Sequence, residues 1–505
     1  MMIGNIQTMR NIDQDCILKL GIPGIILMET AARKLLNHVL ENPAENIVVI
    51  CGTGNNGGDG FALSRLLFIE NKNVKIYLTG NLENMSEACK TNFDICTALN
   101  IPIEILALNC ELSNFMMDVK KADILIDSIL GTGTDRSVSD FLVQIFEIIN
   151  NNSKYILSVD VPSGLNSDTG EPFNKCIIAN KTVTFQLIKR GFLNYGAEKY
   201  TGEVVVEKIG IPDSVLKNND TKEYVIDKQF VQENLRKRDK YSHKGTFGHI
   251  TLFGGSKGFE GAICLSAKAC VKAGAGTVTM CVSEDIVNIV KLKILEAMVI
   301  TYKEENKILE NIKKSKAIAI GPGMGKNNLT LKIVRDLIKT SDVPMVIDAD
   351  GINVLVNNLN LLKEKKSEII LTPHPGEFAR LIGKTSDEVN SNRIDYSKKF
   401  AKEHGVILVL KGYRTVVTDG DLTFINTSGD SAMATGGMGD SLTGIIASII
   451  SQNSNPLIST SIAVFLHGFC GDMLSLENYS VQPTDLINFI PRAMKDICGH
   501  SNDIY

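Results

Sequence analysis

Near the end of this 505-residue chain lies the stretch Thr435-Gly436-Gly437-Met438-Gly439-Asp440, followed by the apolar run Ser441-Leu442-Thr443-Gly444-Ile445-Ile446-Ala447. The glycines let the backbone approach a phosphate group closely and point N–H groups at it, and the start of the predicted helix adds partial positive charge there. Asp440 would be repelled by phosphate, so it is better suited to accept a proton from a hydroxyl that attacks phosphorus. A glycine-rich loop without chemistry is the alternative for this stretch taken alone.

Composition and charge are those of an ordinary globular protein. Hydrophobic residues make up 44% and charged residues 22% of the chain, and its 505 residues are enough for at least two domains. The net charge of −4 favours no nucleic-acid partner. The 11 cysteines are scattered without a CxxC pair, so we expect reduced thiols, no zinc and a cytoplasmic location. No run of about 18 apolar residues predicts a membrane span, and the charged N-terminus does not resemble a signal peptide.

Short apolar runs alternate with helix-like segments in two series, which is typical of mainly parallel sheets covered by helices. A charged, lysine-rich stretch over residues 213–245 separates them, and we expect it to be a linker and the entry to a second domain. The first series predicts strands at residues 47–51, 74–78, 124–127, 155–160 and 204–206. The second predicts strands at residues 250–253, 278–281, 317–320, 343–347, 369–371, 406–410 and 415–417. Ligands of such sheets bind beyond the carboxyl ends of the strands.

A glycine-rich run follows the first predicted strand: Gly52-Thr53-Gly54-Asn55-Asn56-Gly57-Gly58-Asp59-Gly60, ahead of a predicted helix. Its spacing satisfies GxGxxG, so a Rossmann dinucleotide site is one interpretation. Two features argue against it. The next strand ends Leu78-Thr79-Gly80-Asn81, without the acidic residue that would hold a ribose, and Asp59 would lie where the pyrophosphate belongs.

Two further strands of this series end in aspartate. Asp127 is followed by Gly131-Thr132-Gly133-Thr134, and Asp160 is followed by Pro162-Ser163-Gly164. Asn56, Asp127 and Ser163 offer oxygen ligands that suit a hard cation, which leaves Asp160 as a possible acid or base. Capping of helices and turns is the alternative role of each aspartate taken singly.

In this order, the motifs resemble the N-terminal domain of the bifunctional NAD(P)H-hydrate repair enzymes, over about residues 1–212. The resemblance rests on residues 54–60, 127–133 and 158–164, with Gly21-Ile22-Pro23 and Leu27-Met28-Glu29 upstream. It implies an epimerase that interconverts the R and S forms of hydrated NADH or NADPH at C6 of the nicotinamide ring. Asp160 would move the proton, and Asn56, Asp127 and Ser163 would hold potassium. The implied substrate contacts are Asn55, Asn56, Gly57, Gly58, Asp59, Gly131, Thr132, Gly133, Thr134, Asp135, Arg136, Ser137 and Asp160.

The second series also carries polar groups after its strands. The run Gly321-Pro322-Gly323-Met324-Gly325-Lys326 is one residue short of a P-loop and lacks the following Ser or Thr, so we expect a strand-end turn that a ligand approaches. Asp348 and Asp350 end another strand, where they could organise magnesium with phosphate or cap the turn. His374 lies between two prolines in Thr372-Pro373-His374-Pro375-Gly376-Glu377, which fix the backbone and aim the imidazole, although a rigid turn would also account for them.

These motifs resemble the NAD(P)H-hydrate dehydratase domain of the ribokinase-like superfamily over about residues 226–505. The resemblance also rests on His243-Lys244-Gly245, Gly254-Gly255-Ser256, Gly258, Gly261-Ala262, Lys411-Gly412 and residues 436–440. The resemblance implies that the hydrated cofactor contacts Ala262, Gly323, His374 and Asp440. It implies that an adenine nucleotide contacts Lys411, Gly412, Tyr413, Arg414, Thr415 and Gly439. Because hydroxide is a poor leaving group, the enzyme would phosphorylate the C6 hydroxyl from ADP or ATP with Mg²⁺ and then expel phosphate, with Asp440 as the base.

We therefore expect an α/β protein: a Rossmann-like three-layer αβα epimerase domain over residues 1–215, then a ribokinase-like αβα dehydratase domain, ADP-dependent, over residues 226–505. The expected partners are hydrated NADH and NADPH, ADP or ATP, and further copies of the chain in a homo-oligomer. Two alternatives remain open. One is a kinase for a vitamin precursor or sugar with an N-terminal ligand-binding module, which leaves His374 unexplained. The other is a first half that binds ligands or acts as a scaffold without catalysis.

Overall fold

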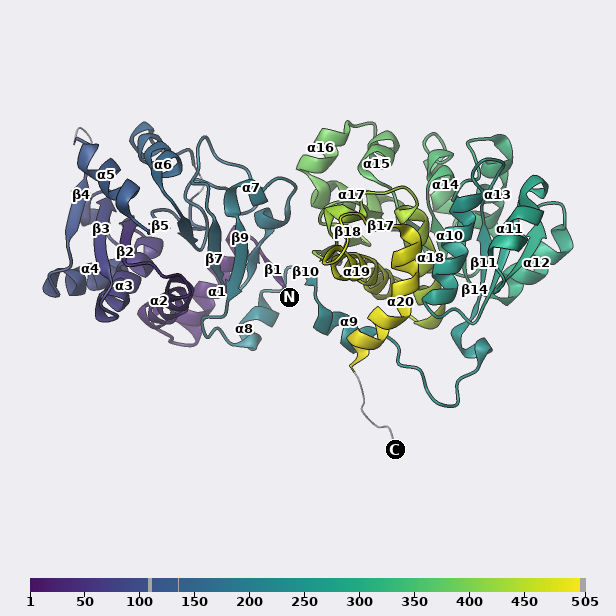
Figure 1. The fold of residues 1–505 in the computed structure, drawn as a ribbon, viewed down its shortest axis with the longest axis horizontal. Helices are drawn as coiled ribbons and strands as arrows, with labels where there is room; N and C mark the ends of the chain where they lie inside the picture. The colour runs from purple at the N-terminus through teal and green to yellow at the C-terminus, as the bar shows by residue number, and fades with distance from the viewer. Residues whose placement is uncertain (108–110, 135, 500–505) are drawn as a thin grey trace. The chain divides into compact units, whose positions relative to one another are not determined.

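The computed structural model describes residues 1–107, 111–134 and 136–499 (Figure 1). The chain divides into two compact units, Met2–Thr221 and Lys222–Tyr505, the second of which also includes Met1. The division falls within the charged stretch 213–245. Much of that stretch is folded, because it contains α8 (Asp213–Asn218), β10 (Glu223–Ile226) and α9 (Lys228–Asn234).

The first unit is built on a seven-stranded sheet in the order β4-β3-β2-β5-β6-β7-β9, with every neighbouring pair parallel. A separate two-stranded parallel sheet pairs β1 (Ile3–Gly4) with β8 (Ile188–Lys189). In chain order the strands of the main sheet are β2 (Asn46–Cys51), β3 (Asn73–Thr79), β4 (Ile103–Leu106), β5 (Ile124–Ser128), β6 (Ile156–Val159), β7 (Lys181–Phe185) and β9 (Glu203–Glu207).

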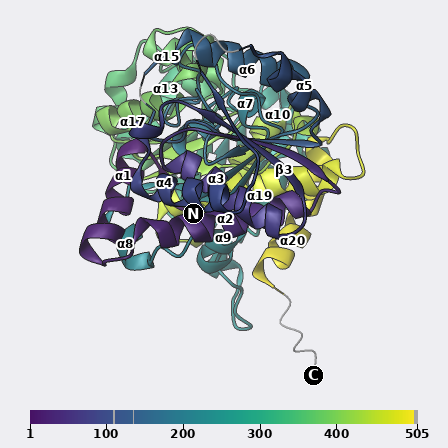
Figure 2. The same ribbon diagram turned by 90° about the vertical axis from the view of Figure 1, so that its left-hand side faces the viewer.

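Helices cover both faces of this sheet, as the end view in Figure 2 shows. Successive residues of β2 point to opposite faces: Ile47 and Val49 belong to one core cluster, and Val48 and Ile50 to another. The first cluster includes residues of α1 (Ile6–Gln14), α2 (Gly24–Leu40), α3 (Asn55–Ile69) and α4 (Glu87–Ala98); the second includes residues of α5 (Ser113–Lys121) and α6 (Asp140–Asn152). The unit is therefore the expected three-layer αβα domain, completed by the short helix α7 (Glu198–Thr201).

The second unit contains a ten-stranded sheet in the order β10-β19-β18-β17-β16-β15-β14-β11-β12-β13. Its neighbours are parallel except for the pairs that β18 makes with β17 and β19. Its strands are β10, β11 (His249–Phe253), β12 (Thr277–Val282), β13 (Ala297–Thr301), β14 (Ser315–Ile320), β15 (Met345–Ile347), β16 (Ile369–Leu371), β17 (Ile407–Leu410), β18 (Val416–Thr418) and β19 (Thr423–Asn426).

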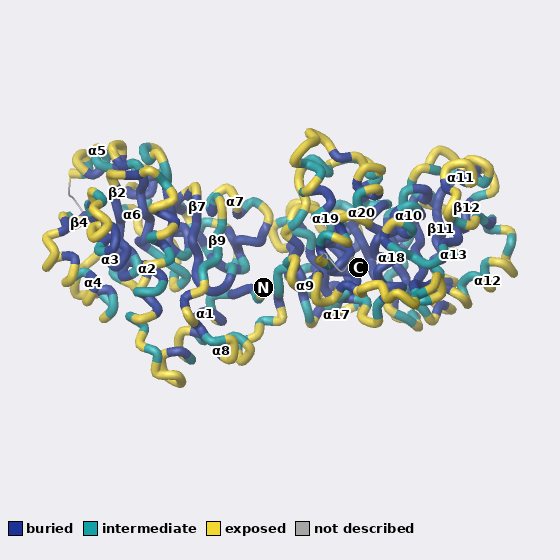
Figure 3. Tube along the Cα trace, turned by 60° about the horizontal axis from the view of Figure 1, so that its bottom comes forward, coloured by how far each residue is buried: buried dark blue, intermediate teal, exposed yellow. Residues whose placement is uncertain are grey.

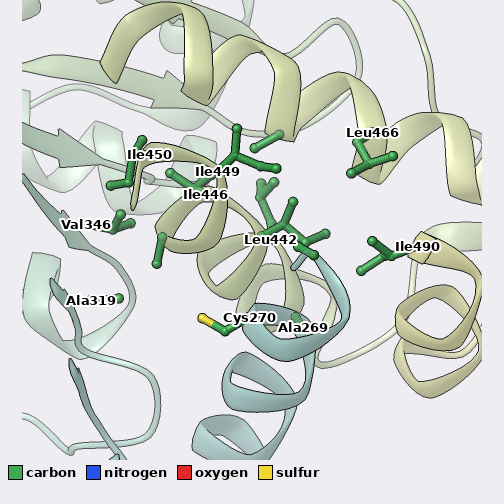
Figure 4. Packing of buried hydrophobic residues seen from close by; sticks show 14 of the residues in the cluster. Ala269, Cys270, Ala319, Val346, Leu442, Ile446, Ile449, Ile450, Leu466 and Ile490 are labelled. Atoms are coloured by element: carbon green, nitrogen blue, oxygen red, sulfur yellow. The ribbon is translucent and has the colours of Figure 1, made fainter. Parts of the chain in front are cut away.

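Helix α18 (Met438–Gln452) lies at the centre of the largest core cluster of this unit. Figure 4 shows its Leu442 and Ile446 packed among side chains from α10 (Glu260–Lys272), α19 (Pro456–Ser475) and α20 (Pro483–Cys498) and from the sheet. Residues 441–452 are all buried, so the helix is held on every side. The remaining helices are α9, α11 (Val287–Lys293), α12 (Glu305–Lys314), α13 (Asn328–Thr340), α14 (Asp350–Asn353), α15 (Pro375–Ile382), α16 (Ser386–Ser391) and α17 (Arg393–His404).

Helix α19 is long and apolar enough to cross a membrane by length and composition, and it is the one such helix among the described residues. However, 67% of its most apolar window is buried inside the protein, where its side chains join the same core cluster as α18. Figure 3 shows that buried residues follow the strands and central helices of both units. Helix α19 is therefore a core helix of the second unit.

The sequence patterns did not indicate β4, β7, β10, β13 or β19, nor the two-residue strands β1 and β8. Strands β4, β10 and β13 are at sheet edges, where only part of the strand is buried and the apolar run is short. Strands β7 and β19 contain threonines, which look polar in the sequence but are fully buried, as at Thr182, Thr184 and Thr423.

Candidate active sites

The first unit contains a cavity of about 1020 Å³ beyond the carboxyl ends of β2, β5 and β6. This is where an open parallel sheet is expected to bind its ligand. Gly57 and Gly58 are buried inside α3, Ser137 is exposed and does not line the cavity, and Asp135 lies outside the described residues. The predicted residues that do line the cavity are Asn55, Asn56, Asp59, Gly131, Thr132, Gly133, Thr134, Arg136 and Asp160.

The glycine-rich run is not the loop that the sequence predicts, because α3 already begins at Asn55. Its glycines allow close packing of this helix: a Cβ at Gly57 would lie 1.9 Å from the carbonyl oxygen of Gly52, and one at Gly60 would lie 2.7 Å from Ser128. The helix therefore rests directly on the strand ends, and its first two turns carry Asn55, Asn56 and Asp59 to the cavity.

Asp160 directly follows β6 and has the positive φ of 63° that non-glycine residues rarely adopt. Its Oδ1 lies 2.8 Å from the Nζ of Lys189 and accepts a hydrogen bond from the Oγ1 of Thr184 at 3.0 Å. Lys189 is almost fully buried. Burial alone would raise the pKa of Asp160, but the Lys189 ammonium brings it below its ordinary value. Asp160 is therefore an ionised carboxylate at neutral pH.

Three other carboxyl groups line the same cavity, those of Asp13, Asp59 and Asp140, and the first two differ from Asp160. Burial and the negative charge of Asp160 raise the pKa of Asp13 to about 6 and raise that of Asp59 well above its ordinary value. Asp13 lies on α1, in a segment without a motif, so nothing in the sequence pointed to it.

Asp127, Ser163 and Asn56 are brought together around the segment after β5. Asp127 is fully buried; its Oδ2 accepts a hydrogen bond from the backbone N–H of Ser163 at 2.8 Å and its Oδ1 accepts one from the Ser163 hydroxyl at 2.5 Å. A Cβ on Gly131 would lie 3.2 Å from the Asn56 side chain, whose Oδ1 and Nδ2 are buried without a hydrogen-bond partner among the described residues. Ser163 also contacts Leu130, the residue before Gly131, so a buried amide oxygen, a hydroxyl and a carboxylate all lie near residues 130–131. Oxygen ligands of these kinds suit a hard cation.

In the second unit, the stretch around Asp440 forms the start of α18. Gly437, with a φ of 94°, is the N-cap residue, and no described side chain caps the helix. The first intrahelical bond is donated by the N–H of Ser441 to the carbonyl of Gly437 at 3.1 Å, so the amides of Met438, Gly439 and Asp440 precede it. These amides point out of the helix start, which is the arrangement that binds phosphate.

Asp440 lies beside a buried charge network. The Nζ of Lys411 is 2.7 Å from the Oδ1 of Asp348, whose Oδ2 accepts a hydrogen bond from Thr443 at 2.7 Å. A Cβ on Gly439 would lie 3.3 Å from that Nζ, which places the network against the first turn of α18. Burial and the charge of Asp348 raise the pKa of Asp440 to about 6, although Lys411 acts in the opposite direction. Asp440 is thus a carboxyl group that can take up a proton near neutral pH.

Ala262 and Gly323 come together near Asp440. Gly323 has a φ of 65°, and a Cβ there would lie 3.2 Å from the Cβ of Ala262. The hydroxyl of Ser266 lies 3.2 Å from the carbonyl oxygen of Ala262 and 2.8 Å from that of Asp440. Ser266, which the sequence did not indicate, therefore connects two of the predicted contact residues.

His374 is the N-cap residue of α15. Its Nδ1 accepts a hydrogen bond from the N–H of Gly376 at 3.0 Å, and its own N–H donates to the Oε2 of Glu377 at 2.9 Å. The imidazole thus forms the rigid turn that was the alternative interpretation, but it is also exposed. Burial of part of the ring lowers its pKa, so the ring is neutral at pH 7 and Nε2 carries the proton. The N–H of Lys411 donates to the carbonyl of Pro373 at 2.9 Å, so His374 lies next to the Lys411 turn.

Five of the six predicted nucleotide-binding residues, 411–415, form the turn between β17 and β18, whereas Gly439 lies in the first turn of α18. Gly412 and Arg414 have positive φ values of 124° and 56°, and the Thr415 hydroxyl donates to the carbonyl of Gly412 at 2.9 Å. Tyr413 is 45% exposed, whereas the Lys411 ammonium points to Asp348. The buried guanidinium of Arg393 donates to the carbonyls of Leu410 and Lys411, which begin the turn, and no sequence motif indicates this residue.

Asp350 also lies at this edge of the sheet, where its Oδ2 accepts a hydrogen bond from the N–H of Gly325 at 2.8 Å. Gly321 does not leave room for a ligand, because a Cβ there would lie 1.8 Å from the carbonyl oxygen of Asp348. Within the described ranges, no group of three or more His, Cys, Asp or Glu side chains could hold a metal ion. A magnesium ion here would therefore depend on few carboxylates and on phosphate oxygens.

Comparisons with known proteins agree with this arrangement. Residues 250–492 match the NAD(P)H-hydrate dehydratase family, and residues 24–191 match the YjeF-related protein N-terminus. The chain is 33% identical over 495 residues to the bifunctional NAD(P)H-hydrate repair enzyme Nnr of Moorella thermoacetica, covering 94% of this chain and 93% of that protein. It is 31% identical over 455 residues to the protein of the same name from Escherichia coli, covering 89% and 85%.

Two solved structures align with 55% of the chain. One is a hypothetical protein from Streptococcus mutans, with 34% identity, a TM-score of 0.50 and 100% of that chain covered. The other is a ribokinase-like superfamily protein from Enterococcus faecalis, with 28% identity, a TM-score of 0.50 and 97% covered. The expected fold class and the resemblance are confirmed, and the vitamin or sugar kinase is not supported. The chain belongs to the family of bifunctional NAD(P)H-hydrate repair enzymes.

Proposed function

We propose that the chain repairs hydrated NADH and NADPH in two steps. The first unit interconverts the R and S forms at C6 of the nicotinamide ring, and the second unit dehydrates the S form to NAD(P)H with ADP as the phosphoryl donor. The observation that carries the proposal is Asp440, a carboxyl group with a pKa of about 6 on the amide-lined start of α18. A proton acceptor beside phosphate-binding amides suits the phosphorylation of a hydroxyl group.

In the dehydratase reaction, Asp440 takes the proton of the C6 hydroxyl as this oxygen attacks the terminal phosphorus. The amides of Met438, Gly439 and Asp440 stabilise the charge on the transferring group, and the nearby Lys411 ammonium adds positive charge. The C6–O bond then breaks, phosphate leaves with the bonding electrons, and loss of the C5 proton forms the C5–C6 double bond. Ala262 and Gly323 lie near Asp440, and His374 lies next to the Lys411 turn, so these three residues would position the ring.

Magnesium fits this site as a partner of the nucleotide phosphates. The charge of Asp348 is neutralised by Lys411. Asp350 is therefore the better magnesium ligand. Its Oδ2 accepts one backbone hydrogen bond, and its Oδ1 accepts none from a described residue. Mg²⁺ commonly binds through one or two carboxylates plus phosphate oxygens and water. When bound, it would neutralise charge on the transferring phosphoryl group. The exposed Tyr413 and its turn, residues 411–415, would hold the nucleotide with Gly439.

In the epimerase reaction, Asp160 accepts and returns a proton at the C6 oxygen. Lys189 keeps this carboxyl group ionised and fixes its orientation through the 2.8 Å contact. Asn55, Asn56, Asp59 and the loop that begins at Gly131 line the cavity and would hold the hydrated ring and its ribose.

Potassium fits beside the epimerase site on the ligands Asn56, Asp127 and Ser163. The Oδ1 of Asn56 is buried and accepts no hydrogen bond from the part of the chain that the structure describes. The Ser163 hydroxyl now donates to Asp127 but also lies 3.2 Å from the carbonyl of Leu130, so it can donate there when a cation takes the carboxylate oxygen. When bound, the ion would fix the Gly131 loop against α3.

The proposal is tested with separated R and S forms of hydrated NADH, with Mg²⁺ and either ADP or ATP. Wild type should restore the dihydronicotinamide absorbance from both forms, with ADP as the better donor. Asp440→Asn should stop this recovery but keep the R–S exchange seen by chromatography, and Asp160→Asn should repair the S form alone. Asp336→Asn removes an exposed aspartate of α13. It is the control for the loss of a carboxylate and should behave as wild type. No recovery with either nucleotide would sink the dehydratase assignment.

We also propose that the protein acts in the cytoplasm and assembles as a homo-oligomer. Ten described cysteines are free thiols, and nine of them are buried, which suits a reducing compartment. Size-exclusion chromatography with light scattering tests the assembly, and a monomeric mass across micromolar concentrations would refute it.

A further inference from the structure

We propose that Asp13 of α1 is a second catalytic carboxyl group of the epimerase site, which exchanges a proton with the C6 oxygen on the side of the ring opposite to Asp160. This inference rests on the proposed epimerase function of the first unit. It assigns a role to a residue that carries no motif and that lies more than 140 positions away from Asp160 in the chain.

The chemistry of inversion at C6 requires two groups in opposite protonation states. An acid protonates the C6 hydroxyl on one face, the C6–O bond breaks to release water, and the N1 lone pair forms a C6–N1 iminium double bond. Water then adds to the other face of C6 while a base takes its proton, and the iminium electrons return to N1. One proton enters and one leaves, so an ionised and a protonated carboxyl group exchange roles in each turnover.

The geometry of the cavity supplies such a pair. Asp13 and Asp160 both line it, but they come from different elements, helix α1 and the end of β6. The Asp160 carboxylate forms an ion pair with Lys189 and accepts a hydrogen bond from the Thr184 hydroxyl. By contrast, the Asp13 carboxyl group makes no hydrogen bond or ion pair with a described residue, and it is accessible from the cavity. It is therefore free to contact a bound ring.

The charges around Asp13 support a carboxyl group that is protonated up to about pH 6. Burial and Asp160 raise its pKa to about 6, while Lys189 acts in the opposite direction. Asp59, on α3, has its pKa raised further, so it would keep its proton and act as a hydrogen-bond donor. On α1 itself, Arg10 donates to the carbonyl of Gly133 at 3.2 Å. The remaining charged residues that line the cavity are Arg136 and Asp140.

The test is the R-to-S exchange rate of the full chain without nucleotide, measured by chromatography from pH 5 to 8. Asp13→Asn should lower kcat by about 100-fold with little change in KM. Because the active pair shares one proton, the wild-type rate should fall about tenfold per pH unit above pH 6, and Asp13→Asn should lose this limb. Asp13→Glu should keep the limb and regain part of the rate, which shows that the site is folded.

Asp15→Asn is the matched control, because Asp15 is two residues away, does not line the cavity and pairs with Lys19 at 2.7 Å. It should stay within about twofold of wild type. An Asp13→Asn rate within twofold of wild type, or a retained alkaline limb, would overturn the proposal. A wild-type protein without any R-to-S exchange would instead refute the epimerase function itself, so the two failures are distinguishable.

Discussion

Replacing Lys189 with methionine tests how the fold holds an ionised carboxylate at the epimerase site. The Lys189 ammonium is 2.8 Å from Asp160, and it donates to the Oγ1 of Thr184 at 2.8 Å and to the carbonyls of Phe185 and Leu187 at 3.1 and 3.3 Å. Lys189 is only 1% exposed. Methionine keeps the length of the side chain but removes its charge and all these donors.

The expected loss is about 3–5 kcal/mol of unfolding free energy at pH 7.5, because the carboxylate stays buried without its counter-ion. In wild type the pKa of Asp160 is lowered, so its stabilising contribution is present above the unfolded pKa and disappears as the pH falls. In Lys189→Met, burial without the ammonium raises the pKa of Asp160. The carboxyl group then destabilises the folded state as the pH rises, which is the opposite of its effect in wild type. The deficit should therefore be at least about 1 kcal/mol smaller at pH 4.5.

Urea unfolding followed by hydrogen exchange and mass spectrometry measures this deficit, with peptides of residues 2–221 read separately from the rest. This readout is needed because the chain has no tryptophan. The double variant Lys189→Met/Asp160→Asn should regain about 2 kcal/mol at pH 7.5, because it no longer buries a charge. A deficit under about 1 kcal/mol, or one that is equal at both pH values, would refute the reasoning.

Four other outcomes are expected. Dehydratase kcat/KM should rise about tenfold per pH unit up to pH 6 and then level off, because Asp440 must be ionised; a flat profile from pH 5 to 8 would exclude this base. Gly444→Ala should destabilise the second unit by about 1–3 kcal/mol, because its Cβ would lie 2.1 Å from the carbonyl oxygen of Ser266. Calorimetry should show a lower melting temperature, and an unchanged transition would contradict the close contact. His374→Ala should lower the unfolding free energy by about 1 kcal/mol, because α15 loses its N-cap. Urea unfolding measures this loss, and an unchanged unfolding free energy would contradict the capping role. Asn56→Leu should abolish any stimulation of the epimerase by potassium over lithium, and stimulation at the wild-type level would exclude Asn56 as a ligand.

Much of the fold followed from the sequence because its buried strands are continuous apolar runs. The runs at residues 47–51 and 124–127 became the central neighbours β2 and β5, whose ends support the cavity. The glycine-rich run between residues 52 and 60 was harder to interpret, because glycine lowers helix propensity. Here the glycines are helical, since α3 packs so closely on the strands that a Cβ would clash.

The sites were predictable where a motif marked them and hidden where tertiary contacts alone create them. Asp440 and Asp160 followed from their positions after glycine runs and strand ends. Lys189, Thr443 and Ser266 could not be inferred, because each acts through one contact with a residue distant in the chain. Thr443 and Ser266 are ordinary side chains for a buried helix, and Lys189 looks like a surface residue in the sequence, although it is buried. Only the folded arrangement gives these three side chains their distant partners.

The left-handed backbone at Asp160 limits how position 160 can change during evolution. Most L residues pay about 1–2 kcal/mol to adopt this conformation, whereas asparagine and aspartate tolerate it because their short side chains bond locally. Glutamate, the usual conservative replacement for aspartate, is therefore a poor one here. The accessible neutral neighbour is asparagine, which keeps the turn but removes the carboxylate and leaves the buried Lys189 ammonium without its counter-ion. A lineage that drifts at this position would therefore lose the proton transfer and part of its stability in one step.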